Sequence, residues 1–301
     1  MTQQAAHPAE PGAVPIDVPA GACDCHMHLF DPAVPFVPGA VLRPGEANAG
    51  QYLRLMRRLG IGRNVLVQPS SYGRDHRVLL AGLRRLGDSA RGIAVIDPLT
   101  PADELLELRD HGVVGVRFNL VQAGAPTADM LEPVARLIQP FGWHIQLHAH
   151  SGDLIGLADR LLALPVPVVI DHFARLHADV ASTGHAERVE ATVARLLASR
   201  RVWLKLSAPY IAAPGSPPQA ALGGFVRRLA DASLDQLVWG TDWPHVTAPD
   251  APDDAALMQL LAHWFSPGER QRVLVENPAR LYRFPAPLTA PAPGASLPVP
   301  L

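Results

Sequence analysis

Short apolar segments alternate with longer amphipathic ones along most of the chain. The short segments are dense in Val, Ile and Leu, as is typical of strands that are covered on both faces. They lie at residues 22–28, 64–68, 92–96, 113–118, 143–148, 166–171, 202–207 and 236–241. Between them, apolar residues recur at helical spacing, as at residues 48–60, 100–112, 151–164, 185–200 and 223–232.

Eight strands separated by helices predict an α/β fold, a single (β/α)₈ TIM barrel. A doubly wound parallel sheet is the alternative, but no glycine-rich phosphate turn follows the first strand. In the helix at 100–112, Thr100 is the expected N-cap and Gly112 the stop. Residues 1–20 and 285–301 are rich in Pro and Ala, so we expect a barrel domain at 21–284 between two tails that bury little.

The length of 301 residues suits one such barrel, and a formal charge of −2 without a basic run argues against nucleic acid as a partner. No apolar stretch is long enough to span a membrane, and the N-terminus lacks the pattern of a secretory signal. The only cysteines, Cys23 and Cys25, lie too far apart along one strand for a disulfide. We therefore expect a cytoplasmic protein that acts on a small molecule, and a homo-oligomer is left open.

The first strand, "ACDCHMH", places two histidines one residue apart. Side chains two positions apart share a strand face, so Asp24, His26 and His28 are predicted to point one way. Cys23, Cys25 and Met27 are then predicted to point the other way. The polar face could bind a ligand, or the two histidines could be hydrogen-bonded residues of a half-buried strand.

Chemistry in a barrel is expected at the carboxyl ends of the strands. Polar side chains recur at those positions, namely His26, His28, Gln68, Arg117, His148, His172, Arg175, Asp242 and His245. Ser70 and Tyr210 follow strands two and seven and, with Gln68 and His245, are further candidates for substrate binding. Lys205 and Ser207 could be polar filling of the barrel, and His144 is expected to be a core residue.

Three imidazoles and a carboxylate, from His26, His28, His148 and Asp242, suit a divalent ion, Zn²⁺ first and Mn²⁺ as the alternative. Such an ion lowers the pKa of a bound water toward neutrality. Asp242 is then the expected general base, and His172 is expected to polarise a carbonyl or take a proton. Arg117 and Arg175 can clamp a substrate carboxylate, although Arg117 could instead support the barrel interior.

Five segments together resemble the amidohydrolase superfamily (amidohydrolase family 2), and within it the lactonase branch that contains the pyrone dicarboxylate lactonases. They are "ACDCHMHLFD", "GVVGVRFNL", "VVIDHFARL", "VWGTDWPH" and "VLVENPARLYRF", and the resemblance covers residues 20–284. It implies a (β/α)₈ barrel that opens a lactone ring, with Asp242 as the base. The residues that would act with it are His26, His28, Arg117, His172 and Arg175.

Two departures from that branch bear on the substrate and the metal. The pyrone dicarboxylate lactonases work without a metal and have a tyrosine at the position of His148, which metal-dependent relatives use. Their two further arginines for a second carboxylate correspond to Ala123 and Ile211. The resemblance therefore implies a metal-assisted lactonase for a muconolactone-type or sugar-acid lactone, of the kind met in aromatic compound catabolism. A metal-dependent decarboxylase, a metal-free pyrone dicarboxylate lactonase and a non-catalytic scaffold barrel are the alternatives.

Overall fold

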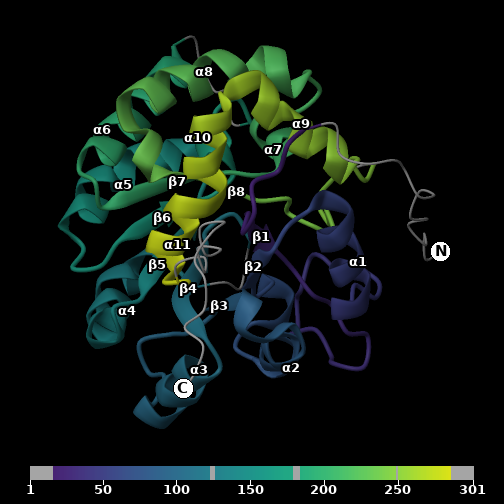
Figure 1. The fold of residues 1–301 in the computed structure, drawn as a ribbon. Coiled ribbons are helices and arrows are strands. Elements are labelled where there is room, and N and C mark those ends of the chain that lie inside the picture. Colours follow the sequence, from purple (N-terminus) through teal and green to yellow (C-terminus); the bar gives the residue numbers. More distant parts are fainter. Residues whose placement is uncertain (1–15, 123–125, 179–183, 249, 286–301) are drawn as a thin grey trace, which may run out of the picture.

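The computed structural model describes residues 16–122, 126–178, 184–248 and 250–285. Its eight strands are parallel, and each is hydrogen-bonded to the next in chain order (Figure 1). They are β1 Cys23–Met27, β2 Arg63–Val67, β3 Ala90–Ala94, β4 Val113–Asn119, β5 His144–His148, β6 Val168–Ile170, β7 Val202–Leu206 and β8 Leu237–Trp239. All eight predicted strands are confirmed, as is the barrel fold.

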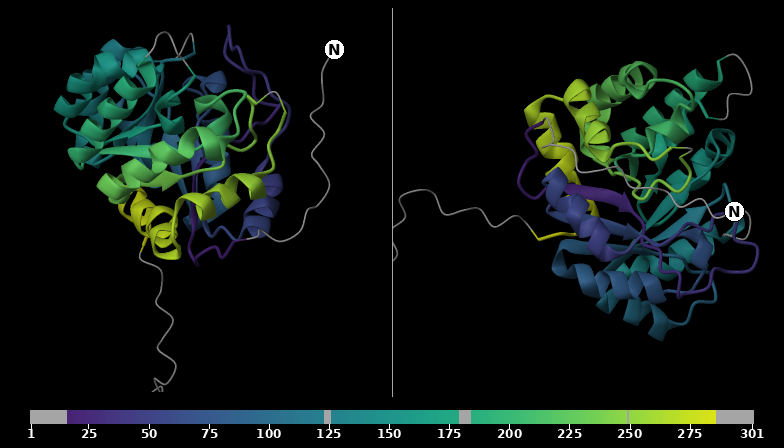
Figure 2. Two further views of the ribbon diagram at one scale, coloured as in Figure 1. Left: turned by 90° about the horizontal axis from the view of Figure 1, so that it is seen from above. Right: turned by 90° about the vertical axis from the view of Figure 1, so that its right-hand side faces the viewer.

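Helices surround the strands in both views of Figure 2. They are α1 Ala49–Leu59, α2 Arg77–Leu86, α3 Ala102–Asp110, α4 Leu131–Ile138, α5 Ser151–Ala163, α6 His185–Ala198, α7 Pro209–Ala212, α8 Pro218–Ser233, α9 Asp254–Trp264, α10 Pro267–Gln271 and α11 Asn277–Tyr282. The prediction that Thr100 caps α3 is wrong, because Pro101 is the N-cap residue. The Thr100 hydroxyl instead accepts a hydrogen bond from the Asp97 N–H at 3.1 Å.

The barrel closes at the end of the molecule where the strands have their carboxyl ends. The segment after β8 forms a parallel bridge to β1 between Trp243 and Met27. The Asp242 N–H donates to the His26 carbonyl at 2.8 Å, and the His28 N–H donates to the Trp243 carbonyl at 2.8 Å. These bonds hold His26 and His28 beside Asp242.

A β-bulge in β1 makes part of the predicted face pattern wrong. Asp24 pairs with Asn64 and Met27 pairs with Leu66, so three steps along β1 match two steps along β2. An extra residue in one strand shifts the side chains beyond it to the opposite face. Asp24 therefore does not share a face with the two histidines, and Met27 does not share a face with the two cysteines.

The side chains on either side of the bulge confirm this change of face. The Tyr52 hydroxyl of α1 donates to Asp24 at 2.8 Å, so Asp24 lies on the helix side of β1. Cys23 and Cys25 are buried free thiols inside the barrel. Their cluster includes Val65, Val67, Ile93, Val169, Trp203, Val238, Leu281, Tyr282 and Phe284. The residues of α11 and just beyond it thus close the amino-terminal end of the barrel.

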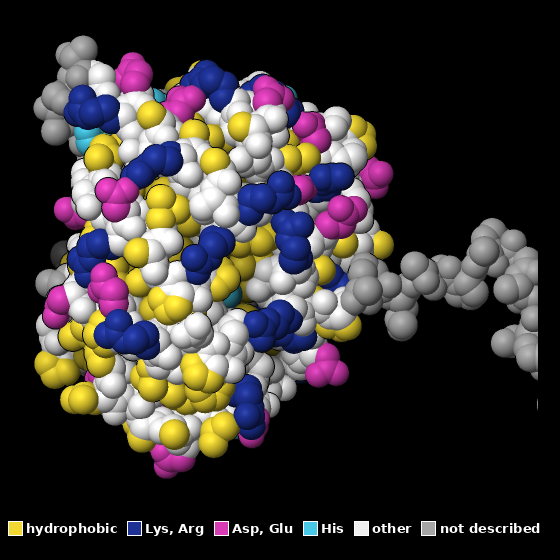
Figure 3. Space-filling model, turned by 90° about the vertical axis from the view of Figure 1, so that its left-hand side faces the viewer, with side chains coloured by type: hydrophobic (Ala, Val, Ile, Leu, Met, Phe, Trp, Pro, Cys, Tyr) yellow, Lys and Arg dark blue, Asp and Glu magenta, His cyan; other side chains and the backbone are white. Residues whose placement is uncertain are grey.

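The outer surface carries charges of both signs. On the face in Figure 3, Arg side chains are interspersed with Asp, Glu and scattered hydrophobic side chains. In the described part of the chain, no helix is long and apolar enough to cross a membrane. Of the predicted tails, 1–20 and 285–301, residues 1–15 and 286–301 lie outside the described residues, so the extent of the tails stays a prediction. Ile16 and Val18, within the first predicted tail, are partly buried against the core.

Candidate active site

Most of the predicted site residues lie around one cavity at the carboxyl end of the barrel. Arg117 comes from β4, His148 from β5, His172 from the turn after β6, and Asp242 from the segment after β8. The full lining is His28, Phe30, Leu42, Pro69, Ser70, Ser71, Arg117, Asn119, Gln122, His148, His172, Ile211, Asp242, Val246 and Thr247. The cavity therefore lies where a barrel of this kind places its chemistry.

Three buried side chains converge on a point that a metal ion could occupy. His26 Nε2 lies 3.3 Å from His28 Nε2, and Asp242 Oδ1 lies 3.5 Å from the first and 3.7 Å from the second. Ligand atoms at the corners of a tetrahedral zinc site are about 3.3 Å apart, because each lies about 2.0–2.1 Å from the metal. The three atoms are thus spaced as a divalent ion requires, and they form one of the groups able to hold a metal in the described residues.

The protonation of His28 fits a metal. His28 Nδ1 donates to the Val67 carbonyl at 2.7 Å, which leaves Nε2 with its lone pair free. Burial lowers the pKa values of His26, His28 and His148 well below the usual range for histidine, so these rings are neutral near pH 7. Neutral imidazoles are the form that coordinates metals.

His148 lines the same cavity but does not belong to the three-residue group. Both of its ring nitrogens are buried, and neither has a hydrogen-bond partner among the described residues. Buried polar atoms without partners are uncommon and call for a ligand or an ion. His148 is thus available to a metal or a substrate, and its role as a metal ligand stays a prediction.

Asp242 has one oxygen for the cavity and one for a supporting network. Its Oδ2 accepts a 2.6 Å hydrogen bond from the Tyr210 hydroxyl, which also lies 3.3 Å from His245 Nδ1. His245 Nε2 lies 2.9 Å from Asp254 Oδ1, at the start of α9. This network leaves Oδ1 facing His26, His28 and His172. Tyr210 and His245 therefore contact the predicted base or its partner and do not line the cavity.

Burial raises the pKa of Asp242 to about 6, although Tyr210, His245 and Arg117 each favour the ionised form. A carboxylate with that pKa is ionised at neutral pH and still basic enough to accept a proton. The backbone φ of Asp242 is +67° and that of His245 is +64°. Such left-handed conformations cost about 1–3 kcal/mol for residues other than glycine and concentrate at functional sites.

His172 begins a turn, His172–Arg175, in which four consecutive residues have positive φ. The turn places His172 Nε2 3.9 Å from Asp242 Oδ1, and His172 Nδ1 is hydrogen-bonded to Ser207 Oγ at 2.9 Å. His172 therefore lies beside the predicted base. Arg175 is not part of the cavity lining, although its charge is close enough to lower the pKa of His148.

Arg117 is a buried cation that points into the cavity. One of its terminal nitrogens donates to the Gln68 carbonyl at 3.1 Å, and its Nε has no partner. Among the described residues, no carboxylate lies within ion-pair distance of Arg117, so the barrel supplies no partner for its charge. The Gln68 side chain bonds the backbone of Gly73 and Val95 and does not line the cavity. Ser70 does line it and accepts a hydrogen bond from Asn119.

A buried ion pair below the cavity was missed as a functional element. Lys205, the only lysine of the chain, lies 3.1 Å from Asp171 Oδ1, 2.7 Å from Gln146 Oε1 and 3.2 Å from His26 Nδ1. Burial alone would raise the pKa of Asp171, but Lys205 and His26 hold it well below its usual range. The pair is thus ionised and fixes the ring of His26 from behind. A lone lysine inside an apolar strand was the signal available in the sequence.

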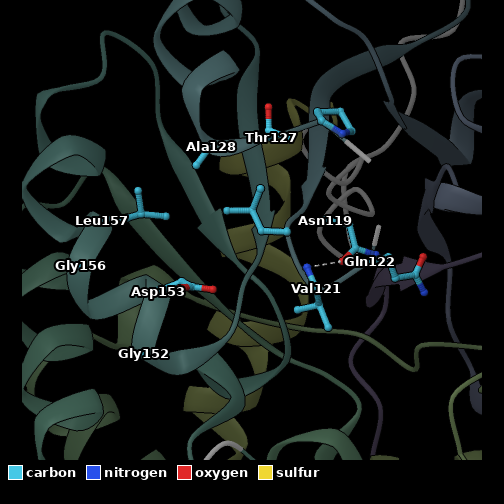
Figure 4. Close-up of a pocket in the computed structure, with 11 residues that line it drawn as sticks. Asn119, Val121, Gln122, Thr127, Ala128, Gly152, Asp153, Gly156 and Leu157 are labelled. Atoms are coloured by element: carbon cyan, nitrogen blue, oxygen red, sulfur yellow. Dashed lines mark hydrogen bonds between the residues drawn. The ribbon is translucent and has the colours of Figure 1, made fainter. Parts of the chain in front are cut away.

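A second, larger cavity of about 630 Å³ adjoins the cavity that His28, His148 and Asp242 line (Figure 4). Asn119 and Gln122 line both cavities. The second lies between the end of β4 and α5, where Gly152, Gly156 and Asp153 form part of its wall. Its described lining contains none of the clustered histidines, so the smaller cavity is the candidate site.

Comparison with known proteins agrees with this geometry. The model of one family, described as amidohydrolase, matches residues 23–284. The chain belongs to the amidohydrolase family. The match spans the whole barrel, from the first residue of β1 to the residues that close its amino-terminal end. The predicted resemblance is therefore confirmed.

Three characterised relatives are named for lactone chemistry. A 2-pyrone-4,6-dicarboxylate hydrolase from Comamonas testosteroni is 35% identical over 91% of this chain and 94% of its own. A 4-sulfomuconolactone hydrolase from Hydrogenophaga intermedia is 32% identical over 88% of this chain and 89% of its own. A D-galactarolactone isomerase from Agrobacterium fabrum is 30% identical over 88% of this chain and 92% of its own. A solved structure from Agrobacterium tumefaciens is 30% identical, has a TM-score of 0.81 and covers 89% of this chain and 98% of its own.

Proposed function

We propose that this chain is a lactone hydrolase whose substrate carries one carboxylate, of the muconolactone or sugar-acid type. The observation that carries the proposal is that one cavity holds both Asp242 Oδ1, which faces three histidines, and the guanidinium of Arg117, which has no carboxylate partner among the described residues. The relatives support the class of reaction because all three are named for lactone substrates. The cytoplasmic location and a homo-oligomer stay predictions from the sequence.

Three residues of the cavity, Arg117, His172 and Asp242, have parts in the proposed ring opening. Arg117 binds the substrate carboxylate, and His172, with Ser207 donating to its Nδ1, donates from Nε2 to the lactone carbonyl oxygen. Asp242 Oδ1 takes a proton from water as the water oxygen bonds to the carbonyl carbon. The ring C–O bond then breaks, and Asp242 returns the proton to the departing oxygen. The product is a hydroxy acid, which releases one proton near pH 7.

His26, His28 and Asp242, joined by His148, would hold a divalent ion, which we propose to be Zn²⁺ with Mn²⁺ as the alternative. When bound, the ion supplies a Lewis acid that lowers the pKa of water. The neutral rings, the spacing of the ligand atoms and the unpartnered nitrogens of His148 support this assignment. A metal-free mechanism, in which Asp242 acts on free water, is the alternative.

The lining of the two cavities favours one carboxylate over two. Arg117 is the one cationic side chain in the described lining of the catalytic cavity, whereas Ile211 and Val246 are apolar. Asp153 in the adjoining cavity would repel a second carboxylate. Of the two positions where the pyrone dicarboxylate lactonases have arginines, Ile211 lines the cavity and Ala123 lies outside the described residues.

A lactone isomerase is the second candidate, because one relative carries that name. In that reaction Asp242 would take its proton from a hydroxyl of the substrate, and the product would be another lactone. The decarboxylase alternative gains no support from the three relatives.

The substrate class is tested with Arg117→Lys, which keeps the charge and removes the bidentate guanidinium. For a lactone that carries a carboxylate, we expect kcat/KM to fall by at least about thirtyfold, since a charged hydrogen bond contributes roughly 2–4 kcal/mol. For a neutral lactone of the same ring size, we expect a change below about threefold. Equal losses on both substrates would mean that Arg117 supports the barrel and does not read the substrate.

A further inference from the structure

A third cavity, lined by polar residues, lies at the opposite end of the barrel from the proposed catalytic site. It has a volume of about 410 Å³ and lies between the amino-terminal ends of β5–β8 and α11. Its lining is Gly142, His144, Pro167, Arg200, Arg201, Trp203, Gln236, Arg280, Leu281 and Arg283. The volume falls within the range of about 300–1,000 Å³ that is typical of small-molecule sites.

The four arginines of this cavity carry more positive charge than their surroundings neutralise. Among the described residues, Asp235 is the carboxylate paired with one of them, at 3.5 Å from Arg200. Asp235 also binds Arg272, outside the lining, at 2.7 Å. Arg201 donates to the Leu164 carbonyl and Arg283 to the carbonyls of Phe141 and Gly142, which orients their side chains without cancelling their charge.

Two of the arginines occupy backbone positions that favour glycine. Arg200 has a φ of +58° just beyond α6, and Arg283 has a φ of +57° at the end of α11. Glycine adopts this left-handed conformation without steric cost, and it is the usual residue just after a helix. Both helix ends thus carry a guanidinium at the rim of the cavity, at backbone positions where glycine would be unstrained.

His144 lines the same cavity, and its Nε2 is buried against Gly115 of β4. Its Nε2 has no hydrogen-bond partner among the described residues, and its other ring nitrogen bonds the backbone of Val114. Burial, together with the charges of Lys205 and Arg283, lowers the pKa of His144 to about 3, so the ring is neutral. Its Nδ1 therefore carries the proton, and Nε2 can only accept a hydrogen bond.

We propose that this cavity binds the phosphate group of a small phosphorylated molecule, at a site separate from the catalytic one. Guanidinium groups match phosphate oxygens with paired hydrogen bonds. Phosphate oxygens are more basic than sulfate oxygens and therefore accept stronger hydrogen bonds from guanidinium groups. The volume left beyond the phosphate accommodates the rest of a small molecule.

The test uses the full-length protein, with inorganic phosphate as the probe. Phosphate binding is measured by calorimetry and by the shift in thermal unfolding, both at constant ionic strength. The variant is Arg200→Gln combined with Arg201→Gln. Arg272→Gln is the matched control, because it removes an arginine that shares Asp235 but lies outside the lining. Sulfate and citrate are titrated in parallel, and inhibition of lactone hydrolysis by phosphate is measured.

We expect saturable binding of one phosphate per chain, sulfate binding more weakly, and no competition with the lactone. The dissociation constant should rise by at least about tenfold in the double variant, as expected for lost charged hydrogen bonds, and stay unchanged in Arg272→Gln. Absence of saturable binding, equal affinity in the double variant, or competition with the lactone would overturn the proposal. Equal binding of sulfate, or tighter binding of citrate that the double variant abolishes, would contradict phosphate as the ligand.

Discussion

Replacing Asp242 by Asn should separate the chemistry of this carboxylate from its effect on stability. The amide has nearly the same shape and can still accept from Tyr210, but it cannot take a proton. Loss of a general base typically lowers the rate by about 10²–10⁴. We therefore expect kcat to fall at least about a hundredfold, and the rise in wild-type rate with pH near 6 to disappear.

The same substitution should make the metal-free protein more stable. Burial raises the pKa of Asp242 from 3.8 to about 6, which corresponds to roughly 3 kcal/mol of destabilisation of its charged form. Because the folded state binds the proton more tightly, wild-type stability falls as pH rises from about 4 to 6. The variant has no such loss, so its advantage should reach an upper limit of about 3 kcal/mol at pH 7 and vanish below pH 4.

Urea unfolding of chelator-treated protein between pH 4 and 8 measures the stability, and initial rates over the same range measure the activity. A variant with near-normal kcat and the same acidic limb would show that the base lies elsewhere, and His172 would be the next residue to test. A variant less stable than the wild type at pH 7 would show that the carboxylate is stabilised in the fold, contrary to its burial.

Three other outcomes follow from the structure. Treatment with a chelator should abolish most activity. His148→Ala should weaken metal binding by at least about a hundredfold, whereas His263→Ala, at an exposed histidine, should leave it unchanged. Full activity without metal would contradict the metal site and favour the metal-free mechanism. Lys205→Met should lower stability by about 3–5 kcal/mol, because Asp171 keeps an unpaired buried charge; an unchanged urea midpoint would refute that ion pair. Limited proteolysis should trim the chain to about residues 21–284, and a dominant cut near residue 150 would contradict a single domain.

The sequence predicts the barrel well because each strand is a dense apolar segment with its own polar ending. The positions of His28, Arg117, His148, His172 and Asp242 around one cavity follow from that alone. In a parallel barrel the carboxyl ends of all strands meet at one rim, so these side chains can be predicted to lie together without knowledge of their contacts.

Features that depend on contacts between distant segments could not be predicted. The bulge in β1 depends on its register with β2, and the alternation of residues gives no sign of it. The partnership of Asp254 with His245 requires the path of the chain after β8. Gln68 has the right position and type for a site residue, but its side chain bonds the loop after β2 and the N–H of Val95, which follows β3.

Hydrolysis of a lactone in ¹⁸O-labelled water tests the central claim most directly. With a carboxylate-bearing muconolactone or sugar-acid lactone, we expect a hydroxy acid heavier than the substrate by one water, with one solvent oxygen in the new carboxylate. One proton should be released for each ring opened. A product of unchanged mass, without solvent oxygen, would identify an isomerase, and loss of carbon dioxide would identify a decarboxylase; either result would contradict a lactone hydrolase.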